Sequence, residues 1–245
     1  MHAWRVHEYG DFRENLTWEE CADPNPPNAG VVIEVAAAGL NFPDLLLIAG
    51  QYQVKAPLPF VPGMEACGTV VATGPDSRFA VGQRIIASNM WGAFGQRMAV
   101  PDRSCFAIPD AMSAVHAAAL TITYQTGYFA LHHRARLTEG ETVLVHGGAG
   151  GVGTAAIQLA RAAGARIIAT AGSDSKLDIC RQCGADEVIN YRDDDFVREV
   201  KTMTGGRGAD VIIDPVGGEV FDQSTRCIAF GGRIVVIGFA SGRIS

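Results

Sequence analysis

The sequence predicts an α/β protein with a doubly wound parallel sheet in its second half and a β-rich first half. From about residue 140 on, short β-branched runs alternate with amphipathic helical stretches, each closed by glycine. This alternation is typical of parallel strands joined by helical crossovers. Up to about residue 110, strand-like runs instead alternate with clusters of Pro, Gly and Asp. We therefore expect two domains, at residues 1–115 and 116–245.

Composition excludes several classes of protein. The 245 residues are 48% hydrophobic, carry a formal charge of −6 and contain no dense Lys/Arg run, which argues against nucleic acid as a partner. No apolar stretch approaches the roughly 20 residues of a membrane span, and the N-terminus lacks a signal peptide, so we expect a cytoplasmic protein that does not enter a membrane. The six cysteines are scattered, which favours reduced thiols over disulfides.

The elements follow from hydrophobic periodicity. In the first half we expect strands at residues 31–40, 68–74, 84–89 and 96–100, followed from residue 113 by one or two connecting helices. In the second half we expect five strands near residues 143–146, 166–170, 187–190, 209–214 and 233–238. Helical stretches separate them, the last one over residues 220–230. A complete dinucleotide-binding sheet of this type has six strands, so the last strand is expected to be missing.

A glycine-rich turn follows the first of these five strands. Gly148-Ala149-Gly150-Gly151-Val152-Gly153 fits G-x-G-x-x-G and opens directly into a helix. The glycines permit a tight turn, close approach of a pyrophosphate and close packing of helix on strand. An ordinary glycine-rich loop is the alternative, but the strand before the motif and the strand–helix units after it favour a Rossmann dinucleotide site.

The end of the next strand bears on the choice of cofactor. A site specific for NAD presents Asp or Glu to the ribose 2′-hydroxyl there, whereas this sequence has Ala171-Gly172-Ser173. Ser173 and Lys176 offer a hydroxyl and a cation to a 2′-phosphate, so NADPH is favoured over NADH. The alternative is that Ser173 merely caps the helix starting at Asp174 and that Lys176 is solvated.

Taken together, the motifs resemble the zinc-independent NADPH:quinone oxidoreductase (zeta-crystallin-like) branch of the medium-chain dehydrogenase/reductase superfamily. The likeness covers the whole chain. Besides the glycine-rich turn, the matching segments are Gly39–Leu46, Phe60–Val70, Gly74–Ile85, Ala117–Leu131 and Ile237–Gly242.

The resemblance implies a GroES-like β-barrel substrate domain followed by an NADP-binding Rossmann domain. Chains of this family return to the first domain after the Rossmann sheet, so this chain is expected to be truncated at its C-terminus. Family members commonly dimerise through the last Rossmann strand, which makes a homodimer an expectation as well.

At the positions where related alcohol dehydrogenases carry zinc ligands, this sequence has other residue types. Asn41 stands where a cysteine ligand would fall, and Met64 replaces the histidine before Glu65. Amide and thioether groups cannot substitute for thiolate and imidazole on zinc, so we expect no metal. Glu65 is expected to be a hydrogen-bonded structural carboxylate.

Other residue types with metal or catalytic chemistry are interpreted as structural. We expect Cys180 and Cys183 to serve in helix packing, and His116 and His146 to be satisfied structural histidines. His132 and His133 are expected at a helix end.

The resemblance also assigns site residues. Asn41, Tyr52 and Thr126 would line the nicotinamide and substrate end, with Asp44 orienting the Asn41 loop. Lys176 and Tyr191 would meet the 2′-phosphate, Gly150 to Gly153 the pyrophosphate, and Phe239 the nicotinamide ribose. Tyr52 could donate a proton or serve only as an aromatic wall, and Asn41 could be only a turn residue.

Without a Lewis acid, the substrate must already be electrophilic. The expected function is hydride transfer from NADPH to a quinone. An enoyl or enone reductase is the alternative on the same fold, and a non-catalytic NADPH-binding protein is the alternative of another class.

Overall fold

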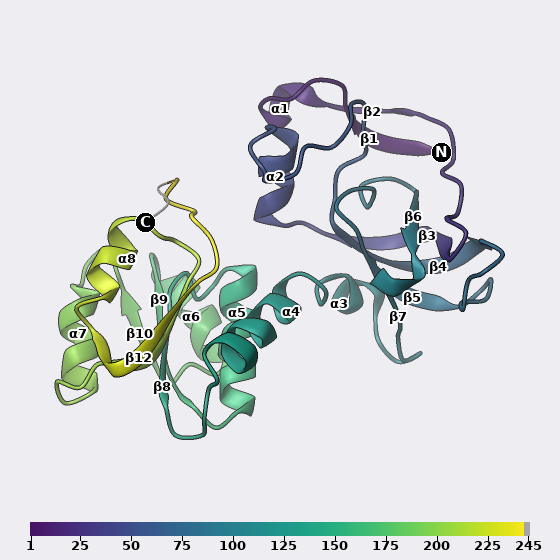
Figure 1. The fold of residues 1–245 in the computed structure, drawn as a ribbon. Coiled ribbons are helices and arrows are strands. Elements are labelled where there is room, and N and C mark those ends of the chain that lie inside the picture. Colours follow the sequence, from purple (N-terminus) through teal and green to yellow (C-terminus); the bar gives the residue numbers. More distant parts are fainter. Residues whose placement is uncertain (243–245) are drawn as a thin grey trace. The chain divides into compact units, whose positions relative to one another are not determined.

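The computed structural model describes residues 1–242, and the chain divides into two compact units, Met1–Ile122 and Thr123–Ser245 (Figure 1). The sequence predicts the change of domain between residues 115 and 116. The last three residues of the predicted second domain, 243–245, lie outside the described part.

The first unit is built from antiparallel strands, as its punctuated sequence predicts. A two-stranded sheet pairs β1 (His2–Val6) with β2 (Leu16–Glu20), and α1 (Phe12–Asn15) connects them. Side chains alternate along each strand, so Val31, Ile33 and Ile85 are buried on one side of the larger sheet. The strands of that sheet are, in spatial order, β6 (Arg97–Pro101), β3 (Gly30–Gly39), β4 (Glu65–Thr73), β5 (Arg84–Ser88) and β7 (Cys105–Ala107).

Short helices complete the first unit. The helix α2 (Phe42–Ile48) directly follows β3 and buries Leu47 and Ile48 in a cluster with Val6, Phe60 and Met64. A 3-10 turn (Asp102–Ser104) links β6 to β7, and α3 (Ala114–Ala118) packs its alanines against β4 and β5.

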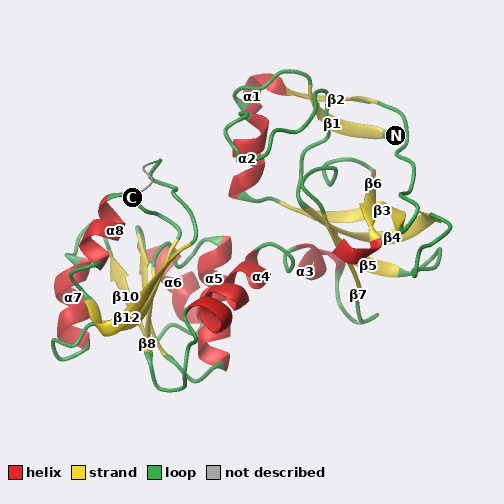
Figure 2. Ribbon diagram, viewed as in Figure 1, coloured by secondary structure: helices red, strands yellow, loops and turns green. Residues whose placement is uncertain are grey.

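The second unit has the Rossmann topology. Its five described strands are all parallel (Figure 2), and the order β10-β9-β8-β11-β12 is the 3-2-1-4-5 part of the dinucleotide-binding arrangement. The strands are β8 (Thr142–Val145), β9 (Arg166–Ala171), β10 (Glu187–Asn190), β11 (Ala209–Asp214) and β12 (Ile228–Val236).

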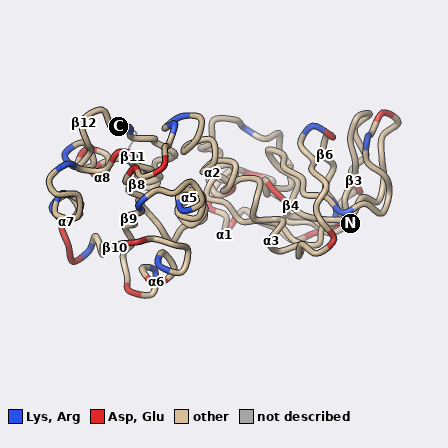
Figure 3. The backbone as a smooth tube through the Cα atoms, turned by 90° about the horizontal axis from the view of Figure 1, so that it is seen from below, with Lys and Arg blue, Asp and Glu red and all other residues tan. Residues whose placement is uncertain are grey.

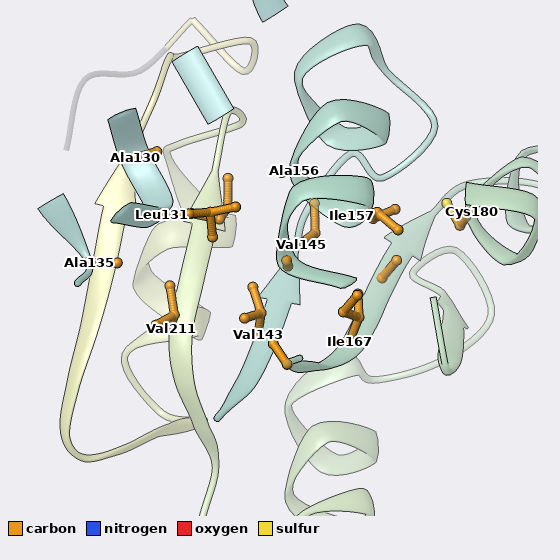
Figure 4. Close-up of a cluster of buried hydrophobic side chains, with 14 of the residues drawn as sticks. Ala130, Leu131, Ala135, Val143, Val145, Ala156, Ile157, Ile167, Cys180 and Val211 are labelled. Atoms are coloured by element: carbon orange, nitrogen blue, oxygen red, sulfur yellow. The ribbon is translucent and has the colours of Figure 1, made fainter. Parts of the chain in front are cut away.

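Helices cover both faces of this sheet because alternate strand residues point to opposite sides. Val143 and Val145 face a cluster with α5 and α6, part of which is seen in Figure 4, whereas Leu144 faces a cluster with α7. The helices are α4 (Thr123–Tyr128), a π-helical turn η2 (Phe129–Arg134), α5 (Gly151–Ala162), α6 (Asp174–Cys183), α7 (Phe196–Met203) and α8 (Glu219–Ser224).

One predicted boundary is wrong. The helical stretch expected over residues 220–230 stops at Ser224, and β12 begins at Ile228 instead of near residue 233. Ile228 pairs with Ala209, and the register then shifts so that Arg233 pairs with Val211. The residues between form an irregularity that includes Gly231 at φ 75°, a conformation that glycine adopts readily.

Basic and acidic residues are interspersed along the backbone of both units (Figure 3). Among residues 1–242, no helix combines the length and the apolar character that crossing a bilayer requires.

Candidate functional site

The glycine-rich turn lies between β8 and α5, as predicted. Gly147 has φ 59°, and the backbone N–H of Gly148 donates to the Thr170 carbonyl at 2.9 Å, which ties the turn to the end of β9. Gly150 precedes the first residue of α5 with extended backbone. The free N–H groups and positive dipole end of this 12-residue helix therefore begin at the turn.

The glycines of the motif serve different purposes. A Cβ atom at Gly153 would collide with the Gly147 carbonyl, and one at Gly148 would lie 2.8 Å from Cys180 Sγ. At Gly150 the one atom within 4 Å of an added Cβ is the Gly147 carbonyl oxygen, at 3.2 Å. Gly148 and Gly153 are thus needed for packing, while Gly150 leaves space for the close approach of a phosphate.

The end of β9 is crowded by the residues that follow the neighbouring strand, β10. An ideal Cβ at Gly172 would lie 2.6 Å from Tyr191 Oη and 3.2 Å from Arg192 Nε. The backbone N–H of Tyr191 donates to Ala171 at 3.2 Å, which fixes this approach. Arg192 was not among the residues predicted for this edge. The available signal was its position directly after β10, because neighbouring parallel strands end at the same edge of the sheet.

Ser173 and Lys176 follow Gly172. Ser173 stands at the N-cap of α6, but its hydroxyl makes no capping bond and lies 3.2 Å from Ser175 Oγ. Lys176 is exposed. Among the described residues, neither Lys176 nor Arg192 forms an ion pair with an acidic side chain, so both cations are available to an anion at this edge.

A buried polar network lies behind the turn. His146 directly follows β8, is 2% exposed, and contacts Thr170 Oγ1 through Nδ1 at 3.0 Å and Ser224 Oγ through Nε2 at 2.9 Å. The Ser224 hydroxyl donates its proton to the Val220 carbonyl, so Nε2–H must be the donor to Ser224 and Nδ1 the acceptor from Thr170. Burial lowers the pKa of His146 to about 4. The prediction of a satisfied structural histidine is confirmed.

Phe239 lies beyond β12 at the same edge of the sheet. The segment that carries it runs beside the end of β11, because Ile237 N–H donates to the Asp214 carbonyl at 2.8 Å and Ala240 N–H to the Pro215 carbonyl at 3.2 Å. Phe239 itself is half-buried.

In the first unit, Asn41 is held at both its main chain and its side chain. It precedes α2 with extended backbone, and its N–H donates to Asp44 Oδ2 at 2.8 Å. Its side-chain Nδ2 donates to Glu65 Oε1 at 2.9 Å. Two carboxylates therefore fix the position of Asn41, which is the N-cap residue of α2.

Glu65 is the hydrogen-bonded structural carboxylate that the sequence analysis expected. It is 1% exposed, and its Oε2 accepts from Thr121 Oγ1 at 2.7 Å and from Ile122 N–H at 2.9 Å. Gly39 stands opposite Glu65 in the sheet, where a Cβ would collide with the carboxylate.

Asp44 is a second buried acid. Burial raises its pKa to about 6, and the charge of Glu65 adds to the rise, while the backbone N–H groups of Asn41 and Met64 oppose it. Its Oδ1 atom is buried without a hydrogen-bond partner among the described residues.

The other two predicted substrate-side residues lie apart in the chain. Tyr52 is half-buried against the cluster that contains Phe60 and Met64, and its N–H donates to the Leu46 carbonyl at 3.1 Å. Thr126 lies on α4 and is half-buried. Asn41, Asp44 and Tyr52 thus belong to the first unit, and Thr126 to the second.

The residues do not fit a zinc ion. Asn41 engages a carboxylate, and the Met64 thioether is buried in an apolar cluster. Within residues 1–242, no three His, Cys, Asp or Glu side chains gather as metal ligands would. Burial raises the pKa of the Cys180 thiol to about 11, and Cys183 packs against the same core cluster, so this pair serves in helix packing as predicted.

Comparisons with known proteins agree with this architecture. Residues 27–110 match the family model described as alcohol dehydrogenase GroES-like domain, and residues 151–245 match the one described as zinc-binding dehydrogenase. Quinone oxidoreductase-like protein 2 of Mus musculus is 41% identical over 96% of this chain and 68% of its own length.

Solved structures are similar over nearly the whole chain. A quinone oxidoreductase of Escherichia coli complexed with NADPH has a TM-score of 0.94 and 31% identity, over 100% of this chain and 75% of its own. CurK enoyl reductase has a TM-score of 0.88 and 34% identity, over 97% and 74%. With its GroES-like first unit and its Rossmann second unit, the chain belongs to the quinone oxidoreductase-like branch of the medium-chain dehydrogenase/reductase superfamily of oxidoreductases.

Proposed function

We propose that this chain is an oxidoreductase that binds NADPH and reduces a small quinone without a metal ion. The observation that carries the proposal is the edge of the second sheet. An open glycine turn and a helix N-terminus lie there, together with two cations, Lys176 and Arg192, that form no ion pair within residues 1–242. No acid stands at residues 171–173 to repel a 2′-phosphate. The Escherichia coli quinone oxidoreductase, described as complexed with NADPH, supports the same cofactor.

The residues present fit this cofactor. Gly151, Val152 and Gly153 would hold the pyrophosphate through backbone N–H groups. Gly150, whose own N–H donates to the Gly147 carbonyl at 2.9 Å, would let the pyrophosphate approach closely because it has no side chain. When bound, NADPH would supply the hydride. The side chains for the 2′-phosphate are a hydroxyl, a phenol and two cations, from Ser173, Tyr191, Lys176 and Arg192.

We propose that residues of the first unit contact the substrate. Asn41 is fixed by two carboxylates, and Tyr52 offers an aromatic face and a phenol. In the second unit, Thr126 is the residue proposed for the nicotinamide end. Because Met64 and Asn41 provide no zinc site, we propose that the acceptor needs no Lewis acid, which favours a quinone over an alcohol or simple ketone.

An enoyl or enone reductase is the second candidate, and the similarity to CurK enoyl reductase favours it. Such a reaction needs a proton donor more than quinone reduction does, and the Tyr52 phenol is the candidate donor. A non-catalytic NADPH-binding protein remains the alternative of another class.

An acceptor panel separates these functions. Oxidation of NADPH is followed at matched concentrations of 1,4-benzoquinone, phenanthrenequinone, a crotonyl thioester and a simple enone. We expect turnover with the quinones alone and a preference for NADPH over NADH. Faster turnover of the alkenes would favour the second candidate, and NADPH binding without electron transfer to any acceptor would favour the third.

Cell fractionation and sedimentation of the purified protein check the predicted cytoplasmic location and homodimer.

A further inference from the structure

A cationic cavity of about 560 Å³ lies in the second unit, away from the glycine-rich turn. One wall comes from the end of η2 and the residues after it, and the other from the first part of β12; Figure 4 shows Ala135 beside this strand. Arg233 on β12 pairs with Val211, which pairs with Val143 near the start of β8. The cavity therefore lies at the amino edge of the sheet, opposite the edge that carries the turn. It is lined by His133, Arg134, Ala135, Arg136, Gly231 and Arg233.

Arg233 holds the two walls together. Its Nε donates to the Ala135 carbonyl at 2.7 Å, and its two Nη atoms donate to the two carboxylate oxygens of Glu141 at 2.7 and 2.9 Å. The remaining two N–H groups donate to the carbonyls of Asp210 and Arg136, at 3.2 and 3.4 Å. All five donors of this guanidinium are thus engaged within the protein, so Arg233 builds the cavity and leaves ligand binding to other residues.

Arg136 has a backbone conformation that favours glycine. Among residues 1–242 it is the one non-glycine residue with a positive φ, at 51°. It directly follows Ala135, the C-cap of η2, and the Leu137 N–H closes the helix end by donating to the Leu131 carbonyl at 2.9 Å. Glycine is the usual residue at this position. The turn itself gives no reason for an arginine, so we look for the reason in what its side chain can bind.

Two cations of the cavity are not neutralised. The neighbouring acids Glu141 and Asp210 are each paired with another arginine. Within residues 1–242, the guanidinium groups of Arg134 and Arg136 form no ion pair and donate no hydrogen bond. The Arg134 guanidinium lies over the Phe129 ring, 4.8 Å from its centroid, and this contact engages its flat face while its N–H groups stay available.

We propose that this cavity binds a phosphate group, which Arg134 and Arg136 hold. Two free guanidinium groups balance the charge of a phosphate dianion, and each planar fork can donate two N–H groups to its oxygens. A carboxylate carries one charge and two oxygens, enough for one of the two arginines. The phosphates of NADPH would bind at the opposite edge of the sheet, so this site is additional to the proposed function and does not depend on it.

Titration of the whole chain with inorganic phosphate, followed by the arginine side-chain Nε–H resonances, tests the site. We expect saturable shifts for Arg134 and Arg136, whose signals are assigned by their loss in Arg134→Gln and Arg136→Gly. Acetate at equal ionic strength should shift neither signal. Glycerol phosphate is titrated in the same way. Tighter binding of this ester identifies an organic phosphate as the ligand, and equal binding identifies free phosphate.

The variant Arg136→Gly separates binding from folding. Glycine adopts a φ of 51° readily, so the denaturant midpoint should equal or exceed that of the wild type. The dissociation constant for phosphate should nevertheless rise about tenfold, because a charge-assisted contact is lost. Arg181→Ala is the matched control. It removes an exposed arginine of α6 that is paired with Asp178, and it should leave the affinity for phosphate unchanged.

Three results would overturn the proposal: phosphate that shifts neither arginine signal, equal shifts with acetate, or an unchanged dissociation constant for phosphate in Arg136→Gly. Failure of the chain to bind NADPH or to turn over any acceptor would refute the proposed function and would leave the outcome at this cavity as it stands.

Discussion

The two units hold their candidate residues by different means. In the first, Asn41 is held by the buried carboxylates Asp44 and Glu65, which are 2% and 1% exposed. In the second, the cofactor edge consists of glycine backbone and of exposed cations that make no ion pair among the described residues. The first arrangement depends on charge and hydrogen bonding, and the second on the absence of side chains. Substitutions should therefore affect the two units in different ways.

The largest effect is expected where the second unit tolerates no side chain. Gly153→Ala places a Cβ against the Gly147 carbonyl and should cost about 3 kcal/mol of stability, because packed backbone must move. Gly150→Ala, with its nearest atom at 3.2 Å, should instead stay within about 1 kcal/mol of wild type yet lose NADPH binding. Denaturant unfolding measures the stability of the two variants, and fluorescence titration with NADPH measures their affinity for the cofactor. Equal stability losses would remove the distinction between packing and phosphate-facing glycines.

The exposed cations should matter for binding and not for folding. Lys176→Ala combined with Arg192→Ala should weaken NADPH binding about 100-fold, because two charge-assisted contacts are lost, and should leave NADH binding unchanged. Lys201→Ala combined with Arg198→Ala is the control, since it also removes two positive charges, but on α7, where Lys201 donates to the Gly206 carbonyl. Titrations with NADPH and NADH measure the two dissociation constants. An equal loss of affinity for NADH would contradict a role of Lys176 and Arg192 in binding the 2′-phosphate.

The stabilities of the two units should change in opposite directions with pH, because each unit buries one group with a shifted pKa, Asp44 in the first and His146 in the second. His146 has its pKa lowered from 6.5 to about 4, so the unfolded state binds more protons in that window and the stability contributed by His146 falls as pH falls from 6.5 to 4. Asp44 has its pKa raised from 3.8 to about 6, so its contribution is present below 3.8 and is lost as pH rises to about 6.

Hydrogen exchange resolved by peptide can follow each unit separately between about pH 4 and 7. Asp44→Asn should remove the pH dependence in peptides of the first unit, and His146→Gln should remove it in those of the second. The same direction of change in both units would show that burial does not govern these two groups.

The smallest effect is expected at Ser173. Its hydroxyl does not cap α6, so Ser173→Ala should change stability by less than about 0.5 kcal/mol. Asp195→Ala is the comparison, because Asp195 accepts from the N–H groups of Val197 and Arg198 at the start of α7 and should lose about 1 kcal/mol. A similar loss at both positions would make Ser173 a capping residue after all.

Sequence reasoning succeeded where the determinants are local. The turn from Gly148 to Gly153 and the parallel strands behind it are each encoded by a short run of consecutive residues. Both are found as predicted. The start of β12 was misplaced because Ile228 is a strand residue only through its pairing with Ala209.

The site was harder to predict because its contacts are not local. Asn41 meets Glu65 across 24 positions and Glu65 meets Ile122 across 57, so neither spacing is visible in the sequence. Arg192 was missed for the same reason, since its place beside Gly172 arises from the pairing of β9 with β10.

Gly172 has a consequence for anyone who redesigns the coenzyme preference of this enzyme. Introducing an acid at that position, the simplest route towards NADH, would drive its first carbon to 2.6 Å from the Tyr191 hydroxyl oxygen. The Tyr191 ring, which is 51% exposed, therefore has to swing aside to admit the acid. A change of coenzyme preference at Gly172 thus also moves the phenol proposed to meet the 2′-phosphate, so the two positions are best redesigned together.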